Sequence, residues 1–402
     1  MRTGYDVAII GAGLVGCAAA YELARRGRRV AVVDQGEMNR GASGRNAGSL
    51  HFQLEPRMLD GGGDPRRLAE LIPVNLQAID DWRRLPEALQ SDLELAMHGG
   101  LMVAETEAER DLLARKCEVE TRSGLPVRIL EGADLRSMAP YLASHVRCAS
   151  YCAAEGHANP RYVTPAYAVA ARAHGAEIIP RRRVCALEAR PGGYRLRCEP
   201  SAAGQGFDAD RSAVDAALVL IAAGAWSREI LAACGVEVPL EPVGLGMNVT
   251  ERCRPMLKHL VQHVGRRLSV KQVESGNVLI GGGWPAALTS FPVLGSDPKI
   301  CLQESSIIGN VAVALDVVPA LAGLQLIRSW SGIACVSPDH LPVLGAVAAL
   351  PGVFIAAGGS SFTLGPTYAR LVSELMASGQ ASMPLQLYRP DRFSDTVSAR
   401  RM

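Results

Sequence analysis

The sequence lacks a charge excess of either sign, has few aromatic residues and contains no long apolar run. Among its 402 residues, Lys and Arg number 42 and Asp and Glu number 40, a net charge of +2, which argues against a nucleic-acid-binding surface. Aromatic residues make up 5%, which disfavours carbohydrate binding and base stacking. No apolar run reaches the roughly 18 residues of a membrane helix, and the first residues show no signal-peptide pattern. We therefore expect a cytoplasmic globular protein of two to three domains.

Cysteine is present, but not in a disulfide or metal-binding pattern. The ten cysteines are scattered through the chain, several of them inside apolar runs, which is typical of buried, reduced thiols. No C-x-x-C pair occurs, and the one close pair, Cys148 and Cys152, has a spacing that is more often accidental than metal-binding. The sequence therefore predicts no zinc, iron–sulfur or other metal site.

The N-terminal segment carries a glycine motif in a specific structural context. Residues 5–34 divide, in order, into a strand, a G-x-G-x-x-G turn, a helix and a second strand, at 5–10, 11–16, 17–26 and 29–34. In this context Gly11 permits the tight turn, Gly13 lets the backbone approach a pyrophosphate, and Gly16 lets the helix pack closely on the sheet. The helix N-terminus would offer unpaired N–H groups to the phosphates. The motif predicts a dinucleotide-binding site.

An acidic residue closes the second strand. Asp34 can accept hydrogen bonds from a ribose, so it favours an unphosphorylated ribose and leaves FAD or NAD as the ligand. A second glycine- and serine-rich loop follows at 40–50, where NAD dehydrogenases normally continue into a helix and a third strand. Such a loop suits a larger dinucleotide whose pyrophosphate and flavin ring need close backbone contacts. At this point the chain resembles the FAD-dependent D-amino-acid oxidase superfamily, which includes glycine oxidase, sarcosine oxidase and D-amino-acid dehydrogenases.

The resemblance extends over nearly the whole chain. Four further blocks carry the resemblance. The first is a Glu-Gly-His-Ala-Asn-Pro loop at 155–160, and the second is an apolar strand that ends in a small-residue turn, at 217–227. The third is a hairpin about Ser-Gly-Asn at 269–283, and the fourth is a C-terminal glycine loop before a helix, at 330–366. The resemblance implies an α/β fold (α+β overall), with a FAD-binding Rossmann-like domain of the glutathione-reductase type and an inserted, mostly antiparallel β-sheet substrate domain. The predicted FAD-binding domain is discontinuous and consists of residues 1–59, 146–239 and 326–402. The predicted substrate or cap domain consists of the two segments between them, 60–145 and 240–325.

The resemblance also assigns residues to the cofactor, which we expect to be FAD held without a covalent link. The assigned residues lie in the two N-terminal glycine loops, at the adenine-contacting position, beside the apolar strand and in the C-terminal block: Gly11, Ala12, Gly13, Leu14, Val15, Gly16, Asp34, Gln35, Ala42, Ser43, Arg45, Asn46, Ala47, Gly48, Ser49, Leu50, Val184, Ala223, Gly224, Trp226, Gly332, Leu344, Gly358, Gly359, Ser360, Ser361, Phe362 and Thr363.

Three residues are candidates for a role in catalysis. His51 follows the second glycine loop, and Lys271 and Gln272 lie on the predicted hairpin. His51 is either in contact with flavin or substrate or a hydrogen-bonded structural histidine. Lys271 either tunes the flavin or binds an acid, or is a solvated strand lysine. His340, in a Pro-Asp-His turn, is interpreted as structural.

The chain departs from simple amino-acid oxidases of this family at one position. These enzymes often carry an arginine two residues after the Trp-Gly motif, where it binds the substrate carboxylate, whereas this chain has Ala334. A carboxylate substrate would then need another cation, and Lys271, Arg45 and Arg57 are the candidates. Cys335 follows directly, but its spacing does not match a covalent flavin link, so we interpret it as a buried thiol.

A narrower resemblance concerns the flavoprotein β subunits of opine oxidases, D-hydroxyproline dehydrogenases and related amine dehydrogenases, through residues 46–53 and the 155–160 loop. It implies oxidation of a secondary amine or amino acid by hydride transfer to the flavin, with partner redox subunits that could also hold the chain at the inner membrane. The run 181–183 is interpreted as a solvated face, or as a docking site for an acidic partner. An oxygen-using oxidase and a non-catalytic FAD-binding subunit remain open. An NAD(P)H-dependent reductase is disfavoured, because a second nucleotide motif and a redox C-x-x-x-x-C are missing.

Overall fold

The first of two large sheets is built around the N-terminal strand. We describe a computed structural model, whose described residues are 4–55, 65–201, 212–290 and 298–393. Strands β1, β2, β8, β11 and β20 run parallel, and β19, β10 and β9 join them antiparallel. Their bounds are β1 Tyr5–Ile10, β2 Val30–Val33, β8 Glu177–Ile179, β9 Arg182–Arg190, β10 Gly193–Pro200, β11 Ala213–Ile221, β19 Val343–Ala346 and β20 Val353–Ala357.

Alternate residues of β1 serve two hydrophobic cores, because successive strand side chains point to opposite faces. Val7 and Ile9 pack with three helices, and Ala8 and Ile10 pack on the other face with the β9–β10 hairpin. The helices are α1 Leu14–Ala24, α7 Pro160–Ala173 and α10 Gly365–Ser378. All four β1 residues are at most 5% exposed, so both faces of the sheet are covered, as expected of a Rossmann-like domain.

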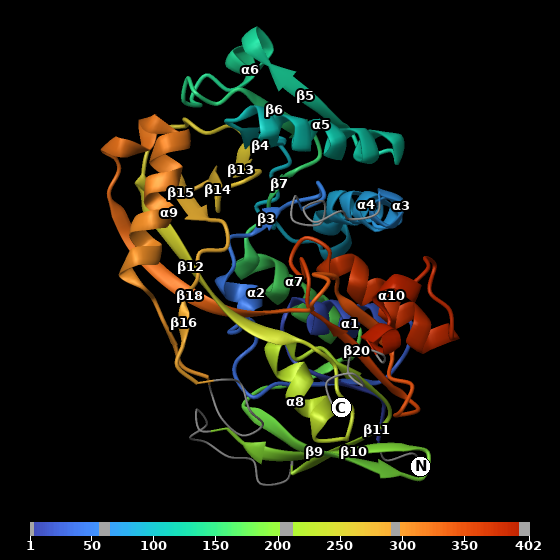
Figure 1. Cartoon of the computed structure of the whole chain (residues 1–402). Coiled ribbons are helices and arrows are strands. Elements are labelled where there is room, and N and C mark those ends of the chain that lie inside the picture. The colour runs from blue at the N-terminus through green and yellow to red at the C-terminus, as the bar shows by residue number, and fades with distance from the viewer. Residues whose placement is uncertain (1–3, 56–64, 202–211, 291–297, 394–402) are drawn as a thin grey trace, which may run out of the picture.

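The second sheet is antiparallel except where β13 pairs parallel with β4. Its order is β18-β12-β15-β14-β13-β4-β6-β5, and Figure 1 draws it above the first sheet. The bounds are β4 Gly100–Ala104, β5 Val127–Glu131, β6 Cys148–Cys152, β12 Glu241–Arg252, β13 Leu260–His263, β14 Ser269–Gln272, β15 Asn277–Gly281 and β18 Leu326–Val336.

Helices and short strands complete the molecule. None of the helices in the described ranges is long and apolar enough to cross a bilayer. The remaining helices are α2 Ala42–Arg45, α3 Pro65–Ala69, α4 Ile72–Leu89, α5 Glu107–Arg122, α6 Gly132–Met138, α8 Ser227–Ala232 and α9 Glu304–Val317. Two small sheets pair β3 Ser49–Leu50 with β7 Gly156–His157, and β16 Ala287–Leu288 with β17 Ile300–Cys301.

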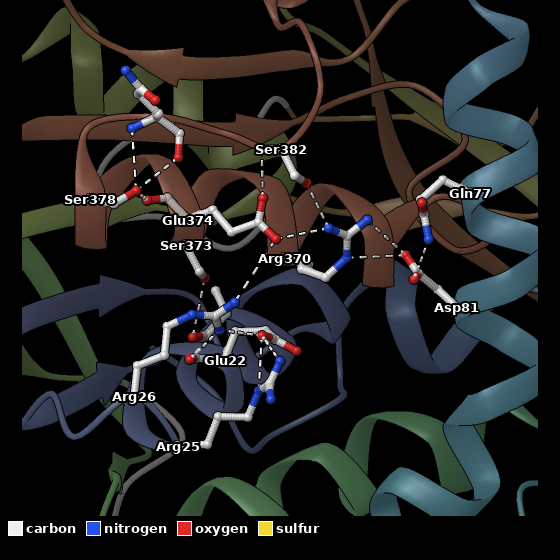
Figure 2. A network of polar contacts seen from close by, with 12 residues as sticks. Glu22, Arg25, Arg26, Gln77, Asp81, Arg370, Ser373, Glu374, Ser378 and Ser382 are labelled. Atoms are coloured by element: carbon white, nitrogen blue, oxygen red, sulfur yellow. Dashed lines mark hydrogen bonds and ion pairs between the residues drawn. The ribbon is translucent and has the colours of Figure 1, made fainter.

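A polar network joins α1, α4 and α10, as Figure 2 shows. Arg370 of α10 makes ion pairs with Glu374 of the same helix at 2.8 Å and with Asp81 of α4 at 3.4 Å. Glu374 also lies 3.9 Å from Arg26, which follows α1. Because α1 carries the glycine motif and α4 belongs to the predicted cap, the network fixes the cap helix to the nucleotide-binding helices.

The predicted fold class is confirmed, and so is the hairpin, whose strands β14 and β15 pair about the Ser-Gly-Asn turn. The first helix begins earlier than predicted, at Leu14, because the last three residues of the motif already form its first turn. The predicted domain boundaries remain a prediction: β6 and β18 fall in segments assigned to the FAD-binding domain but pair in the second sheet. The glycine run at 61–63 lies outside the described residues.

Candidate active site

One cavity of about 1430 Å³ lies where the two sheets meet. Its wall is formed on one side by the β1–α1 turn, the loop after β2 and the loop before α10, and on the other by the β13–β14 loop and residues 281–283. Ligand pockets for drug-sized molecules are typically about 300–1,000 Å³. The cavity therefore has room for a dinucleotide and a small substrate together.

The glycine motif forms a backbone cradle at one end of this cavity. Gly11 has a φ of +111°, and a Cβ there would overlap with the carbonyl oxygen of Ala222. A Cβ on Gly16 would overlap with the carbonyl oxygen of Gly11, so this glycine allows the helix to pack on the turn. Gly13 is the N-cap of α1 and supplies no side-chain cap. The helix N-terminus therefore faces the cavity with backbone groups, as anion binding requires.

Asp34 is held in place at the same end. Its Oδ2 accepts a hydrogen bond from the Ala12 N–H at 2.6 Å, and its Oδ1 accepts one from the Gly36 N–H at 2.7 Å. Burial raises the pKa of the carboxyl, and the two backbone hydrogen bonds oppose that rise. Each oxygen keeps a further lone pair toward the cavity, where a ribose hydroxyl could donate.

The second glycine loop contains a single helical turn, α2, rather than the irregular loop expected. Ser43 accepts a hydrogen bond from the Leu14 N–H at 2.9 Å, which fixes α2 against the start of α1. The side chain of Trp330 donates to the carbonyl oxygen of Arg45 at 2.7 Å. Asn46 accepts a hydrogen bond from the Gly48 N–H at 2.7 Å. The loop is therefore held by contacts to α1 and to β18 of the second sheet.

The C-terminal glycine loop closes the cavity from the side of α10. Gly358, Gly359 and Ser360 have φ values of +83°, +29° and +30°, a conformation that suits glycine and is strained for serine. The buried Trp82 of α4 donates from Nε1 to the Thr363 carbonyl oxygen at 2.6 Å. α10, a helix of 14 residues, begins directly after this loop. A second helix N-terminus is thus directed at the same cavity.

Most of the predicted cofactor residues are brought together by the fold. Those that line the cavity are Gly11, Gly13, Leu14, Val15, Asp34, Gln35, Ala42, Ser43, Arg45, Asn46, Ala47, Ser49, Val184, Ala223, Gly224, Trp226, Gly358, Gly359, Ser360, Ser361, Phe362 and Thr363. Six others lie just behind the wall, where they pack the core or shape the backbone: Ala12, Gly16, Gly48, Leu50, Gly332 and Leu344.

The three catalytic candidates are placed differently. His51 lines the cavity; burial above all, and Lys271 beside it, lower the pKa of the imidazole to about 3. Lys271 lies behind the wall and is 2% exposed, and burial holds the pKa of its amine well below the usual range. Gln272 lies outside the wall: its Oε1 accepts from the N–H groups of Met256 and Leu257. The amide of Gln272 is therefore occupied in holding a cap loop.

A buried ionic network underlies the substrate-facing part of the wall. Glu155 Oε1 accepts from the N–H groups of Phe52 and Gln53 at 2.8 and 2.9 Å, and its Oε2 accepts from the Gln53 side chain at 3.1 Å. Lys116 donates to Gln53 at 2.9 Å and to Glu120 at 2.8 Å. Burial raises the pKa of Glu155 to about 7, although these hydrogen bonds and Lys116 oppose it.

Sequence reasoning missed several residues of the wall. The interpretation of 181–183 as a solvated face is wrong for Arg182, which is 6% exposed and lines the cavity with Arg183 beside Val184. Other residues contributed by the cap and its neighbours had no motif to mark them, because tertiary packing brings them to the wall from separate helices, strands and loops: Gln53, Glu55, Asn75, Met102, Met247, Gln262, His263, Arg266 and Arg267.

The departures from the family pattern are also placed by the structure. Ala334 lines the cavity at the position where an arginine was expected, and Cys335 beside it is buried, with a thiol pKa raised to about 11 by burial. The buried thiol was predicted. Arg45 and Arg267 supply cations on the wall, whereas Arg57 lies outside the described residues. His340, predicted to be structural, lines the cavity at a φ of +60°.

The residues of the wall fit FAD. The glycine backbone at the start of α1 suits a pyrophosphate, Asp34 suits a ribose, and the α2 and 358–364 loops add two further stretches of close-approaching backbone. The backbone N–H groups of these glycine-rich turns are donors of the kind that a dinucleotide pyrophosphate binds.

Comparisons with known proteins agree with this geometry. A family model described as FAD dependent oxidoreductase (DAO) matches residues 6–375. A glycine oxidase from Geobacillus kaustophilus is 29% identical over 388 residues, covering 95% of each chain. An opine oxidase subunit from Agrobacterium tumefaciens is 26% identical, covering 96% of this chain and 97% of the relative.

Solved structures share the fold. The crystal structure of the Geobacillus kaustophilus glycine oxidase superposes with a TM-score of 0.81 at 26% identity, covering 96% of this chain and 98% of that one. L-Proline dehydrogenase from P. horikoshii superposes with a TM-score of 0.84 at 22% identity, covering 98% and 99%. The glycine cradle, the second loop and the C-terminal loop thus all lie within the matched region, and the chain belongs to the DAO family of FAD-dependent oxidoreductases.

Proposed function

We propose that the chain oxidises the C–N bond of an amino acid or secondary amine, of the opine or D-hydroxyproline class, as the flavin-carrying subunit of a multisubunit dehydrogenase. One observation carries the proposal. A single cavity has the nucleotide cradle on one side and, on the other, a wall that contains His51, with Lys271 buried behind it. The similarity to an opine oxidase subunit supports both the substrate class and the role within a complex. The location that follows is the cytoplasm, or the inner membrane surface through partner subunits.

In this proposal the wall residues divide the work. When bound, FAD supplies the electron acceptor for the carbon beside the nitrogen. The 11–16 cradle, Asp34 and the 358–363 loop hold the cofactor, and the rest of the wall holds and orients the substrate. Arg45 and Arg267 are the cations available to a substrate carboxylate in place of the arginine missing at Ala334. Gln272 has no part in it, because its amide is engaged away from the cavity.

A second candidate is an oxygen-using oxidase of a simple amino acid. The similarity to glycine oxidase, at 29% identity, favours it. The two candidates share the amine-oxidation step and differ only in what takes the electrons afterwards.

The test is anaerobic reduction of the purified flavoprotein by a panel of amines, followed at the visible flavin band. The panel contains D-hydroxyproline, proline, sarcosine, glycine, D-alanine, octopine and nopaline. We expect one secondary amine to bleach the band, and admission of air to restore it slowly. Rapid restoration by air would favour the oxidase, and a flavin that no member reduces would contradict the proposed function.

A further inference from the structure

Lys271 is a buried lysine without a carboxylate partner. It is 2% exposed, its Nζ donates to the carbonyl oxygen of Ala47 at 2.6 Å, and Ser49 Oγ lies 2.7 Å from Nζ, within hydrogen-bond distance. No carboxylate in the described part of the chain lies within ion-pair distance of it. Burying an ammonium group without a counter-ion is costly, so the geometry favours the neutral amine, whose lone pair can take up a proton.

Ser49 connects this amine to the cavity. Ser49 lines the cavity, and its Oγ lies 2.7 Å from Lys271 Nζ and 3.5 Å from Ser269 Oγ, which in turn lies 3.3 Å from His51 Nε2. Thr363 holds the segment by donating to the Ser49 carbonyl oxygen and accepting from the His51 N–H, both at 3.2 Å. The short link is the one from Ser49 to Lys271, and both serines and His51 line the wall.

We propose that Lys271 takes up, through Ser49, the proton that the substrate ammonium must lose before its C–N bond is oxidised. The proposal rests on the proposed amine oxidation. An N–H bond of the substrate breaks as Ser49 accepts that proton, and the Ser49 hydroxyl proton passes to Lys271 Nζ, where a new N–H bond forms. The substrate is left as the neutral amine. Bound FAD would supply the acceptor for the hydrogen and the two electrons of the adjacent C–H bond, and the nitrogen lone pair would form the C=N bond.

The other titratable groups around Lys271 do not compete for this proton. They are His51 and His157, which lies opposite Ser49 in the β3–β7 pair. Burial lowers the pKa of both imidazoles to about 3. Both histidines therefore stay neutral in the working range, and a proton that enters the wall comes to rest on Lys271, held by the Ala47 carbonyl oxygen.

The charge state of Lys271 can be measured without turnover. The chain has only four lysines, Lys116, Lys258, Lys271 and Lys299, so ¹³Cε-lysine labelling of the holoprotein gives four NMR signals. We expect the Lys271 signal, assigned with Lys271→Met, to be that of a neutral amine near neutral pH. It should move to the ammonium position when α-aminoisobutyrate binds, an amino acid whose only carbon bonded to the nitrogen carries no hydrogen. An ammonium signal in the free protein, or no movement at saturation, would overturn the proposal.

The pH profile of anaerobic flavin reduction gives the second test. Near neutral pH we expect the rate of flavin reduction in Lys271→Met to be roughly 100-fold lower than in the wild type, which is the scale of general-base catalysis. This rate should rise about tenfold per pH unit until the pH reaches the pKa of the substrate ammonium. Ser49→Ala should show the same slope with a smaller loss. Lys258→Met, at an exposed lysine, is the control.

The outcomes separate the two proposals. If no amine reduces the flavin of the wild-type protein, the proposed function itself is wrong. If an amine reduces the wild-type flavin, and Lys271→Met and Ser49→Ala show the same pH profile as the wild type, only the proposed proton transfer through Ser49 to Lys271 is wrong.

Discussion

The two ends of the cavity are built in different ways. The nucleotide-binding end is made of backbone: glycines at 11, 13 and 16 and the turn at 358–360 form it, and their neighbours along the chain complete it. The opposite end, which we propose faces the substrate, is lined by side chains from separate elements, such as Gln53, and Lys116 and Glu155 hold Gln53 from behind the wall.

This difference decides what each end tolerates. A backbone cradle has no side chain to repack, so an added methyl group must displace the chain itself. A side-chain network can lose one member and still be hydrated or rearranged, at the cost of unsatisfied partners. The nucleotide end should therefore be sensitive to volume, and the substrate end to charge and hydrogen bonding.

Gly16→Ala should give the largest effect. The new Cβ would overlap with the Gly11 carbonyl oxygen, and this oxygen belongs to the turn that cradles the pyrophosphate. We expect a loss of about 3 kcal/mol in the free energy of unfolding and loss of bound FAD, measured by denaturant unfolding and the flavin-to-protein absorbance ratio. Gly323→Ala is the matched control, because nothing lies within 4 Å of a Cβ there and the residue is exposed outside the cavity wall. Equal FAD content in both variants would contradict the backbone account.

Glu155→Gln tests the substrate end. The variant keeps an acceptor for the two backbone N–H groups, but places an amide NH₂ against that of Gln53. We expect it to be less stable by about 2 kcal/mol at about pH 5.5.

The deficit should depend on pH with a definite sign. Glu155 has a pKa of about 7 in the folded protein against 4.5 ordinarily, so between these values the folded state holds a proton that the unfolded chain has lost. That stabilisation, up to about 3 kcal/mol, is full below the unfolded pKa and disappears as pH rises through 7. Wild type should therefore lose stability from about pH 5 to 8 more steeply than Glu155→Gln, as urea unfolding would show. Parallel curves would rule out the titration, and Glu118→Gln at an exposed pair is the control.

The same contrast explains what the sequence could and could not predict. Gly11, Gly13, Gly16 and Asp34 lie within one strand–turn–helix–strand unit, so their spacing alone predicts the nucleotide end. Arg182 could not be placed, because a run of three arginines is typical of a solvated face, and its burial depends on the hydrogen bond from its N–H to the Asp34 carbonyl oxygen. Residues such as Asn75 of α4 and Gln262 of β13 have no local signal, since the tertiary packing that brings them to the wall is not encoded in any spacing.

Trp82→Phe asks whether the cap stabilises the nucleotide end. Trp82 is fully buried on α4, and its Nε1 donates to the Thr363 carbonyl oxygen in the loop before α10. Loss of this hydrogen bond should cost about 1 kcal/mol and weaken FAD binding, because the loop loses a contact that fixes it. Tyr194→Phe is the control, since it removes a similar bond, to the Pro351 carbonyl oxygen, outside the cavity wall. Thermal unfolding followed by flavin fluorescence would compare the temperature of FAD release in the two variants. Release at the wild-type temperature in both variants would contradict a role of Trp82 in FAD binding.

Arg370→Ala should have the smallest effect of the four, although it cuts the network that links α10 to α4 (Figure 2). The Arg370 side chain is 18% exposed, and its 3.4 Å contact with Asp81 is the one that crosses between the helices. Part-exposed ion pairs contribute at most about 1 kcal/mol and are screened by salt. We therefore expect a small loss of stability that shrinks in high salt, against none for Arg122→Ala at a pair in which Arg122 is 78% exposed. A loss of stability as large as that of Trp82→Phe, and independent of salt, would mean that Arg370 supports α10 through packing rather than through charge. In that case the cap would be joined to the nucleotide end chiefly by Trp82.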